Sequence, residues 1–207
     1  MTDSDVGDVH PIEAESYRIL HERVDLSAWP PRARHVVARM IHATADVGYA
    51  TSARIGVRAV DSAVDALTHR APVIVDSTMV TAGTPRLATT CLLDQVPVAP
   101  PGSTRAAAAF ALAAHRYPEG AIWVVGNAPS ALIELLARQR LGEVDPAAVI
   151  GLPVGFVGAA QSKAELWAGP LAPVAITNTG ERGGSPVAAA ALNALHRLHR
   201  LDRGDSC

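Results

Sequence analysis

Short apolar runs alternate along the chain with amphipathic stretches, and the two patterns predict different elements. Each apolar run is four to six residues long and contains β-branched residues. This pattern is typical of strands that are buried on both faces of a parallel sheet. The strands are expected at Pro72–Asp76, 89–93, Ala121–Gly126, Ala147–Leu152 and Pro173–Asn178.

Apolar residues at helical spacing fill the intervals between these runs and the first third of the chain. The helices are expected over His10–Val24, Arg32–Asp46, Val57–His69, 103–116, 129–140, 162–168 and 185–200. Strands that alternate with helices indicate an α/β protein with a mostly parallel sheet. In such a sheet, ligands bind beyond the carboxyl ends of the strands, where the connections switch faces.

We expect one domain over 11–200, preceded by a disordered leader over residues 1–10 and followed by a flexible tail over 201–207. The composition fits this size: the chain has 207 residues, of which 49% are hydrophobic and 4% aromatic, so aliphatic side chains must form the core. A net charge of −2 gives no basic face for nucleic acid.

Targeting signals are not evident in the sequence. No apolar run approaches the roughly 20 residues that span a bilayer, and the acidic N-terminus lacks the pattern of a secretory signal. Cys91 and Cys207 offer neither metal-ligand spacing nor a disulfide framework. We therefore expect a cytoplasmic protein that binds neither nucleic acid nor a membrane.

Three glycines follow the predicted strand near residue 150, in the stretch VIGLPVGFVGAAQSK. Gly151, Gly155 and Gly158 have the spacing G-x-x-x-G-x-x-G, which is not the G-x-G-x-x-G of a dinucleotide site. A P-loop also requires Lys followed by Ser or Thr, whereas the order here is Ser162 and then Lys163. The glycine spacing therefore fits neither common phosphate-binding motif.

Cations gather in the loops that are expected at the carboxyl ends of the strands. Arg86, Lys163 and Arg182 lie in these loops, and Arg105 lies in the first turn of a predicted helix. Four cations near one edge of a sheet indicate an anionic ligand, either a phosphate or a carboxylate.

Seven stretches occur in the order found in one known family and cover most of residues 11–195. They are IEAESYRIL, MIHATAD, DSTMV, GSTRAAAA, GNAPSALIELL, GLPVGFVGAAQSK and GERGGSPVAAAALNAL. Through these stretches the chain resembles the precorrin-8X methylmutases, including the cobalt-precorrin-8 branch, of corrinoid biosynthesis.

The resemblance implies a three-layer, Rossmann-like α/β fold with a mostly parallel sheet of about five strands flanked by helices. It implies an isomerase that moves a methyl group from C-11 to C-12 of a tetrapyrrole with many carboxylates, giving hydrogenobyrinate or its cobalt counterpart. It further implies a homodimer with the active site near the interface, and no nucleotide, redox cofactor or metal. On this interpretation the three glycines leave a floor for a flat macrocycle.

The resemblance also assigns roles to residues at matching positions. His42 matches the proposed proton donor and acceptor, a task that the pKa of an imidazole suits. Asp46 lies four residues further along the predicted helix, so we expect it to orient the ring of His42. Ser16 matches a position that contacts the substrate.

Four further residues are candidates for substrate binding. Arg105 and Lys163 match basic residues that would bind acetate and propionate groups, Arg105 by its planar fork and Lys163 as a point charge. Asn127 would set a turn and cap the next helix, or contact the substrate. Arg86 is the fourth candidate; its loop reads Gly83-Thr84-Pro85-Arg86 where many family members have G-[IV]-T-R, and proline removes a backbone donor.

Two alternative functions use the same loops. One is an α/β protein for nucleotides or phosphorylated metabolites, which the glycine spacing disfavours, as does the lack of an acidic residue suited to a ribose. The other is a non-catalytic corrinoid-binding or carrier protein, which would not need His42.

Overall fold

The computed structural model describes residues 10–204. Residues 1–9 of the predicted leader and 205–207 of the predicted tail lie outside the described residues. His10 is the N-cap of the first helix, where its Nδ1 accepts a hydrogen bond from the N–H of Ile12 at 3.3 Å. The last helix continues to Asp202, which includes the first two residues of the predicted tail.

Helices and strands alternate through most of the described chain. The strands are β1 (Ala53–Ile55), β2 (Val73–Val75), β3 (Ile122–Val125), β4 (Ala148–Gly151) and β5 (Ala175–Asn178). The helices are α1 (Pro11–Arg23), α2 (Pro31–Thr44), α3 (Tyr49–Ser52), α4 (Ala59–Thr68), α5 (Thr78–Gly83), α6 (Arg105–Arg116), α7 (Pro129–Arg140), α8 (Ala159–Ala168) and α9 (Ser185–Asp202), with 3-10 turns at Leu93–Gln95 and Ala172–Val174.

The sheet has five strands in the order β1-β5-β4-β3-β2. The neighbouring strands β2, β3, β4 and β5 are parallel, whereas β1 pairs antiparallel with β5, with Ala53 opposite Asn178. The antiparallel direction brings the segment before β1, which follows α2, to the carboxyl end of β5. The α/β class and the mostly parallel sheet are therefore confirmed.

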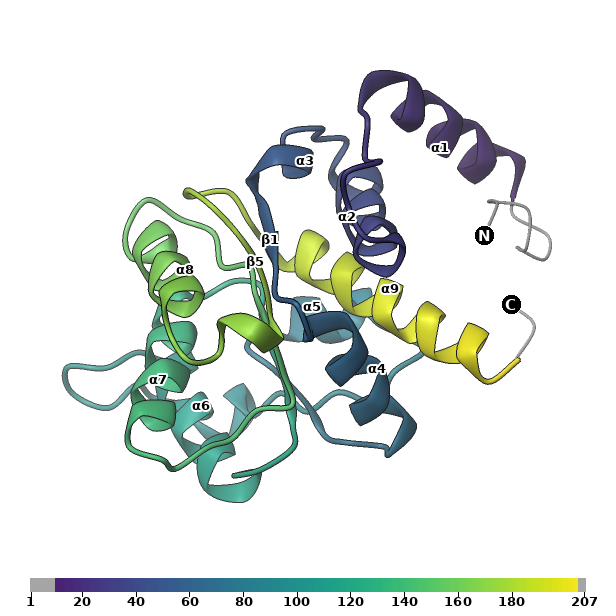
Figure 1. Ribbon diagram of the computed structural model, residues 1–207. Coiled ribbons are helices and arrows are strands. Elements are labelled where there is room, and N and C mark those ends of the chain that lie inside the picture. The colour runs from purple at the N-terminus through teal and green to yellow at the C-terminus, as the bar shows by residue number, and fades with distance from the viewer. Residues whose placement is uncertain (1–9, 205–207) are drawn as a thin grey trace.

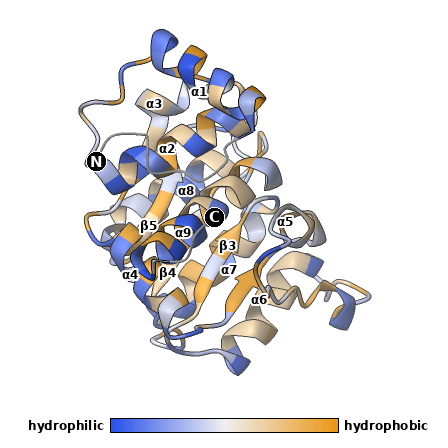
Figure 2. Ribbon diagram, turned by 90° about the vertical axis from the view of Figure 1, so that its right-hand side faces the viewer, coloured by the Kyte–Doolittle hydropathy of each residue, from blue (hydrophilic) through white to orange (hydrophobic). Residues whose placement is uncertain are grey.

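Helices cover both faces of this sheet, which gives three layers (Figure 1). One core lies between the sheet and α2, α4 and α9, and it includes Val75, Ile150 and Val187. The second core lies on the opposite face among α6, α7 and α8, where Phe110 contacts Trp123 edge to face. Figure 2 shows the apolar strands β3, β4 and β5 enclosed between these layers.

The prediction of a strand over residues 89–93 is wrong. Only Thr90 pairs with β2, through a single parallel bridge to Ile74, and a 3-10 turn begins at Leu93. Leu92 is buried in the second core and Leu93 packs against it, so the run is apolar because it contributes to this core and not because it extends the sheet. The fifth strand is instead β1, whose three residues are too few to show an alternating pattern.

Helix α1 lies at the outer rim of the molecule, next to α2 (Figure 1). Leu20 is its one buried residue among those described, while Ile12, near the start of the same helix, is 73% exposed. Few apolar residues therefore attach α1, and polar contacts with α2 also link the two helices. Across residues 10–204, the structure contains no helix that is both long and apolar enough to span a membrane.

Candidate active site

His42 lies on the last full turn of α2, where residues of α1 contact its ring from two directions. The hydroxyl of Ser16 lies 2.9 Å from Nδ1 of His42. The ring of Tyr17 stacks on the imidazole with the centroids 4.9 Å apart and the planes 5° from parallel. Ser16 therefore contacts the edge of the imidazole and Tyr17 contacts its face.

The environment of His42 favours the neutral imidazole. Partial burial lowers the pKa of His42, and the positive charge of Arg39 lowers it further, while Glu13 acts in the opposite direction. A hydroxyl can donate or accept, so Ser16 can pair with Nδ1 in either protonation state of the ring. When Nδ1 donates to Ser16, Nε2 is the atom that can take up or give up a proton.

The prediction that Asp46 orients His42 is wrong. The Asp46 carboxylate accepts a hydrogen bond from the N–H of Gly48 at 2.8 Å and forms an ion pair with Arg182. The Arg182 guanidinium also lies 5.7 Å from the centre of the Tyr49 ring. Asp46 thus attaches the end of α2 to the loop after β5, and Ser16 is the residue that contacts the ring nitrogen.

Lys163 is buried and is not accessible to a ligand in this structure. Its side chain is 1% exposed, and Nζ donates to Oδ1 of Asn178 at 3.1 Å and to the carbonyl of Arg182. Burial lowers its pKa to about 8, and the nearby charge of Arg182 acts in the same direction. The described contacts make Lys163 a support for the loop 178–184, and contact with a substrate carboxylate would require this loop to move.

The loops after β4 and β5 contact one another directly. The N–H of Gly184 donates to the carbonyl of Leu152 at 2.9 Å, and that of Gly155 donates to the carbonyl of Glu181 at 3.2 Å. After β4 the chain continues into α8 on one face of the sheet, and after β5 into α9 on the other. Ligands bind at such a divergence in open α/β sheets, and that a ligand binds here stays a prediction.

The three glycines near this point have different roles. A Cβ on Gly151 would lie 2.6 Å from Cδ2 of Leu166, so this glycine permits close packing of β4 against α8. The prediction that all three form a ligand floor is therefore wrong for Gly151. Gly155 and Gly158 have positive φ values of 141° and 81°, which favour glycine for conformational reasons.

Asp76 was not predicted as a functional residue, yet it organises the loop that carries Asn127. It follows β2, is 2% exposed, and accepts hydrogen bonds from the N–H groups of Gly126 (2.9 Å), Asn127 (2.8 Å) and Ala128 (2.7 Å). Burial raises the pKa of its carboxyl group, while the three donors act in the opposite direction. In the sequence, the signal that could have identified Asp76 was its position as an acidic residue directly after an apolar strand.

The side chain of Asn127 is exposed, and Ala128, not Asn127, is the N-cap of α7. The capping role predicted for Asn127 is therefore wrong, and its contact with a substrate stays a prediction.

Arg105 begins α6, and its exposed guanidinium donates to the carbonyls of Val96 (2.7 Å) and Leu93 (2.9 Å). The α6 N-cap Thr104 is hydrogen-bonded to Ser130 at 2.7 Å, which places the start of α6 beside the start of α7. Arg105 therefore lies at the carboxyl edge of the sheet, as expected. Its two carbonyl partners hold part of the guanidinium, and binding of a carboxylate by Arg105 stays a prediction.

Arg86 lies apart from the other candidates. It is exposed, and its charge acts on His196, about three turns from the start of α9 at Ser185. Because α9 begins at the carboxyl edge, the structure places Arg86 along this helix and does not bring it together with Asn127 and Lys163.

One hollow of the described structure lies elsewhere. It has a volume of about 620 Å³ and is lined by residues that precede β2, β3, β4 and β5, including Glu119 and Asp145. It therefore lies at the amino edge of the sheet, opposite to the candidate site, and none of the predicted site residues lines it.

The fold and the site together define an α/β protein with a histidine held by Ser16 and Tyr17, in which α6, α7, α8 and α9 all begin at the carboxyl edge of the sheet. Helix N-termini favour anions, so this edge suits a ligand with carboxylates. Residues 11–198 match the family model described as precorrin-8X methylmutase. The chain belongs to the precorrin-8X methylmutase family, whose members are isomerases of cobalamin biosynthesis.

Individual relatives agree with this assignment. The cobalt-precorrin-8 methylmutase of Methanothermobacter thermautotrophicus is 37% identical over 199 residues, which covers 93% of this chain and 95% of that protein. The precorrin-8X methylmutase of a Sinorhizobium species is 37% identical, with 91% and 94% covered. The solved structure of a precorrin-8X methylmutase from Thermus thermophilus has a TM-score of 0.83 at 35% identity and covers 96% of this chain and 99% of its own.

Proposed function

We propose that this chain moves the methyl group of precorrin-8X, or of cobalt-precorrin-8, from C-11 to C-12, giving hydrogenobyrinate or its cobalt counterpart. The relatives are named for both substrates, so both belong to the proposal. The observation that carries it is the hydrogen bond between Ser16 and Nδ1 of His42, which leaves Nε2 for the proton chemistry. Nothing in the comparisons favours the non-catalytic carrier.

In this mechanism His42 shares a proton with a ring nitrogen of the macrocycle. Proton donation from Nε2 draws electron density from the ring next to the migrating methyl group. The bond from C-11 to the methyl carbon breaks as the bond to C-12 forms, and the proton then returns to Nε2. A substrate with many carboxylates raises the pKa of His42 on binding, because nearby negative charge favours the imidazolium.

Binding of the substrate carboxylates is assigned to the carboxyl edge of the sheet. Arg105 and Asn127 are exposed there, and both are proposed to contact the substrate directly. Lys163 would join them only after movement of the loop 178–184, and Arg86 would require that the ligand extends along α9. Ser16 is proposed to contact the substrate while it holds His42.

A homodimer with the site near its interface is also part of this proposal. Phe156 and Val157 support it, because they are 88% and 87% exposed in the loop between β4 and α8, at the same edge as the site. Exposed apolar side chains in one loop are typical of a surface that contacts a partner. A cytoplasmic location stays a prediction from the sequence.

The proposal is tested by following conversion of precorrin-8X and of cobalt-precorrin-8 by visible absorption. We expect His42→Ala to bind hydrogenobyrinate as tightly as the wild type and to turn over roughly a hundredfold more slowly or worse, the usual contribution of a positioned acid–base group. His115→Ala is the matched control, because His115 is exposed on α6. Equal turnover by the wild type and His42→Ala would remove His42 from the mechanism.

A further inference from the structure

The orientation of His42 is determined by two residues that are adjacent in the sequence. Ser16 holds the ring by its edge, and Tyr17 lies parallel to its face at 4.9 Å. A hydrogen bond alone leaves the imidazole free to rotate about the line that joins Nδ1 to the hydroxyl. The parallel ring of Tyr17 opposes this rotation, so the two contacts together define one direction for Nε2.

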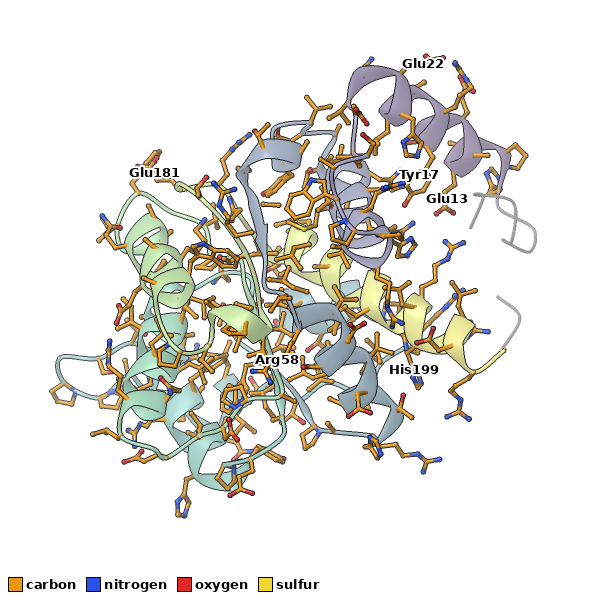
Figure 3. All side chains as sticks on the ribbon, in the orientation of Figure 1. Glu13, Tyr17, Glu22, Arg58, Glu181 and His199 are labelled. Carbon is orange, nitrogen blue, oxygen red and sulfur yellow. The ribbon has the colours of Figure 1, made fainter. Side chains whose placement is uncertain are left out.

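Tyr17 is itself held in place by an ion pair between α1 and α2. Nη1 of Arg39 donates to the Tyr17 hydroxyl at 3.2 Å and to Oε1 of Glu13 at 2.6 Å. The side chains of Arg39 and Glu13 are 24% and 31% exposed, so solvent screens this pair only in part. Figure 3 shows Glu13 and Tyr17 on the side of α1 that faces α2, and Glu22 on the other side.

The residues that make these contacts lie on one face of α1 and on one face of α2. Glu13, Ser16 and Tyr17 follow at spacings of three and four on α1, while Arg39 and His42 are three apart on α2, which places each set on one helical face. The polar contacts that attach α1 to α2 are thus the contacts that orient His42.

We propose that Tyr17, held by the Arg39–Glu13 ion pair, is a positioning residue that fixes the imidazole of His42 in its proton-transfer orientation. This inference deepens the proposed function and rests on the role assigned there to His42. Tyr17 acts on the reaction through the ring that it stacks on and through no contact of its own with the substrate. Correct placement of a reacting group is a large part of the rate in reactions that need mainly orientation.

The charges around His42 change the pKa of its imidazole, which can be measured. Arg39 on α2 disfavours the imidazolium, and Glu13 on α1 favours it. The phenol of Tyr17 faces the ring, and Arg197 on α9 acts on that phenol. Replacing Arg39 by Gln removes the positive charge that lowers the pKa of His42 and releases Tyr17, so we expect this pKa to rise.

The experiment compares Tyr17→Leu, Tyr17→Phe and Arg39→Gln with the control Glu22→Gln. Glu22 is exposed on α1 and pairs with Arg18. For each full-length variant, kcat and KM are measured for precorrin-8X, and the His42 imidazole is titrated by proton NMR after its signal has been identified by its absence from the spectrum of His42→Ala. We expect Tyr17→Leu to lower kcat on the order of tenfold or more with KM unchanged.

Tyr17→Phe keeps the stacked ring but loses the hydrogen bond from Arg39, so its kcat should lie between those of the wild type and Tyr17→Leu. Arg39→Gln should raise the pKa of His42. Wild-type kcat in Tyr17→Leu overturns the proposal, whether or not the titration moves. If Tyr17→Leu does not fold, wild-type kcat in both Tyr17→Phe and Arg39→Gln overturns it instead, because each variant releases Tyr17 from Arg39. Wild-type turnover by His42→Ala contradicts the proposed function. In that case the pKa of His42 in the Tyr17 and Arg39 variants still shows whether these residues determine the environment of the imidazole.

Discussion

Lys163 allows a quantitative test of how the loop after β5 is supported. Its ammonium group is buried with two neutral oxygen partners, one on Asn178 and one on the backbone of Arg182. Burial with neutral partners explains why its pKa falls from the ordinary 10.5 to about 8. The perturbation is Lys163→Met, which keeps the length and the apolar stem of the side chain and removes the titrating group.

The magnitude follows from proton linkage. Between pH 8 and 10.5 the unfolded chain binds a proton at Lys163 that the folded chain has lost, so the contribution of Lys163 to stability rises with pH. The difference between the two pKa values corresponds to about 3 kcal/mol over the whole window. Roughly 2 kcal/mol of this appears between pH 7 and pH 9.5, where the protein can be studied easily.

The assay is urea unfolding of the wild type and Lys163→Met at pH 7, 8, 9 and 9.5. All other titrating groups are common to both proteins, so the difference in their free energies of unfolding isolates Lys163. We expect this difference to move by roughly 2 kcal/mol in favour of the wild type as the pH rises. A constant difference across this range would refute the reasoning, because it would mean that the amine keeps its ordinary pKa.

Two further predictions concern the loops at the same edge of the sheet. Asp76→Asn should lower the free energy of unfolding by about 2 kcal/mol or more, since an amide cannot accept hydrogen bonds from all three N–H groups of residues 126–128. Urea unfolding measures this loss, with Asp65→Asn as the control because the side chain of Asp65 is 75% exposed. Equal loss of stability in both variants would contradict the prediction. Gly183→Ala should cost about 2 kcal/mol in the same assay, because its Cβ would overlap the carbonyl oxygens of Leu152 and Pro153. Wild-type stability of Gly183→Ala would mean that the two loops separate easily.

Most of the fold could be predicted from local patterns in the sequence. The strands β2, β3, β4 and β5 are short apolar runs between helical stretches, and this pattern is sufficient to indicate a parallel sheet. Strand β1 could not be found in this way, because its pairing with β5 depends on tertiary contacts and not on its own three residues. For the same reason the apolar run over 89–93 was misleading, since a loop segment that packs into the core needs apolar residues as much as a strand does.

The sequence indicated which residues belong to the candidate site better than it indicated which contacts they make. The motifs pointed to His42 and Ser16, and the structure brings these two together. The assignment of Asp46 failed because helical spacing shows which residues can meet on one helix and says nothing of partners on other elements, here Arg182. Lys163 was expected to contact a substrate carboxylate, but it is buried, and its burial depends on the loop 178–184, which supplies its partners.

The pairing of β1 with β5 has a consequence for the order in which the molecule assembles. Ala53 and Asn178 are register partners although more than half of the chain lies between them. Closing so long a loop is entropically costly and is typical of a late folding event. The segment that joins α2 to β1 can therefore settle beside β5 only after the C-terminal part of the chain has been synthesised and has added β5 to the sheet. During synthesis on the ribosome, the half of the site that carries His42 would be completed last.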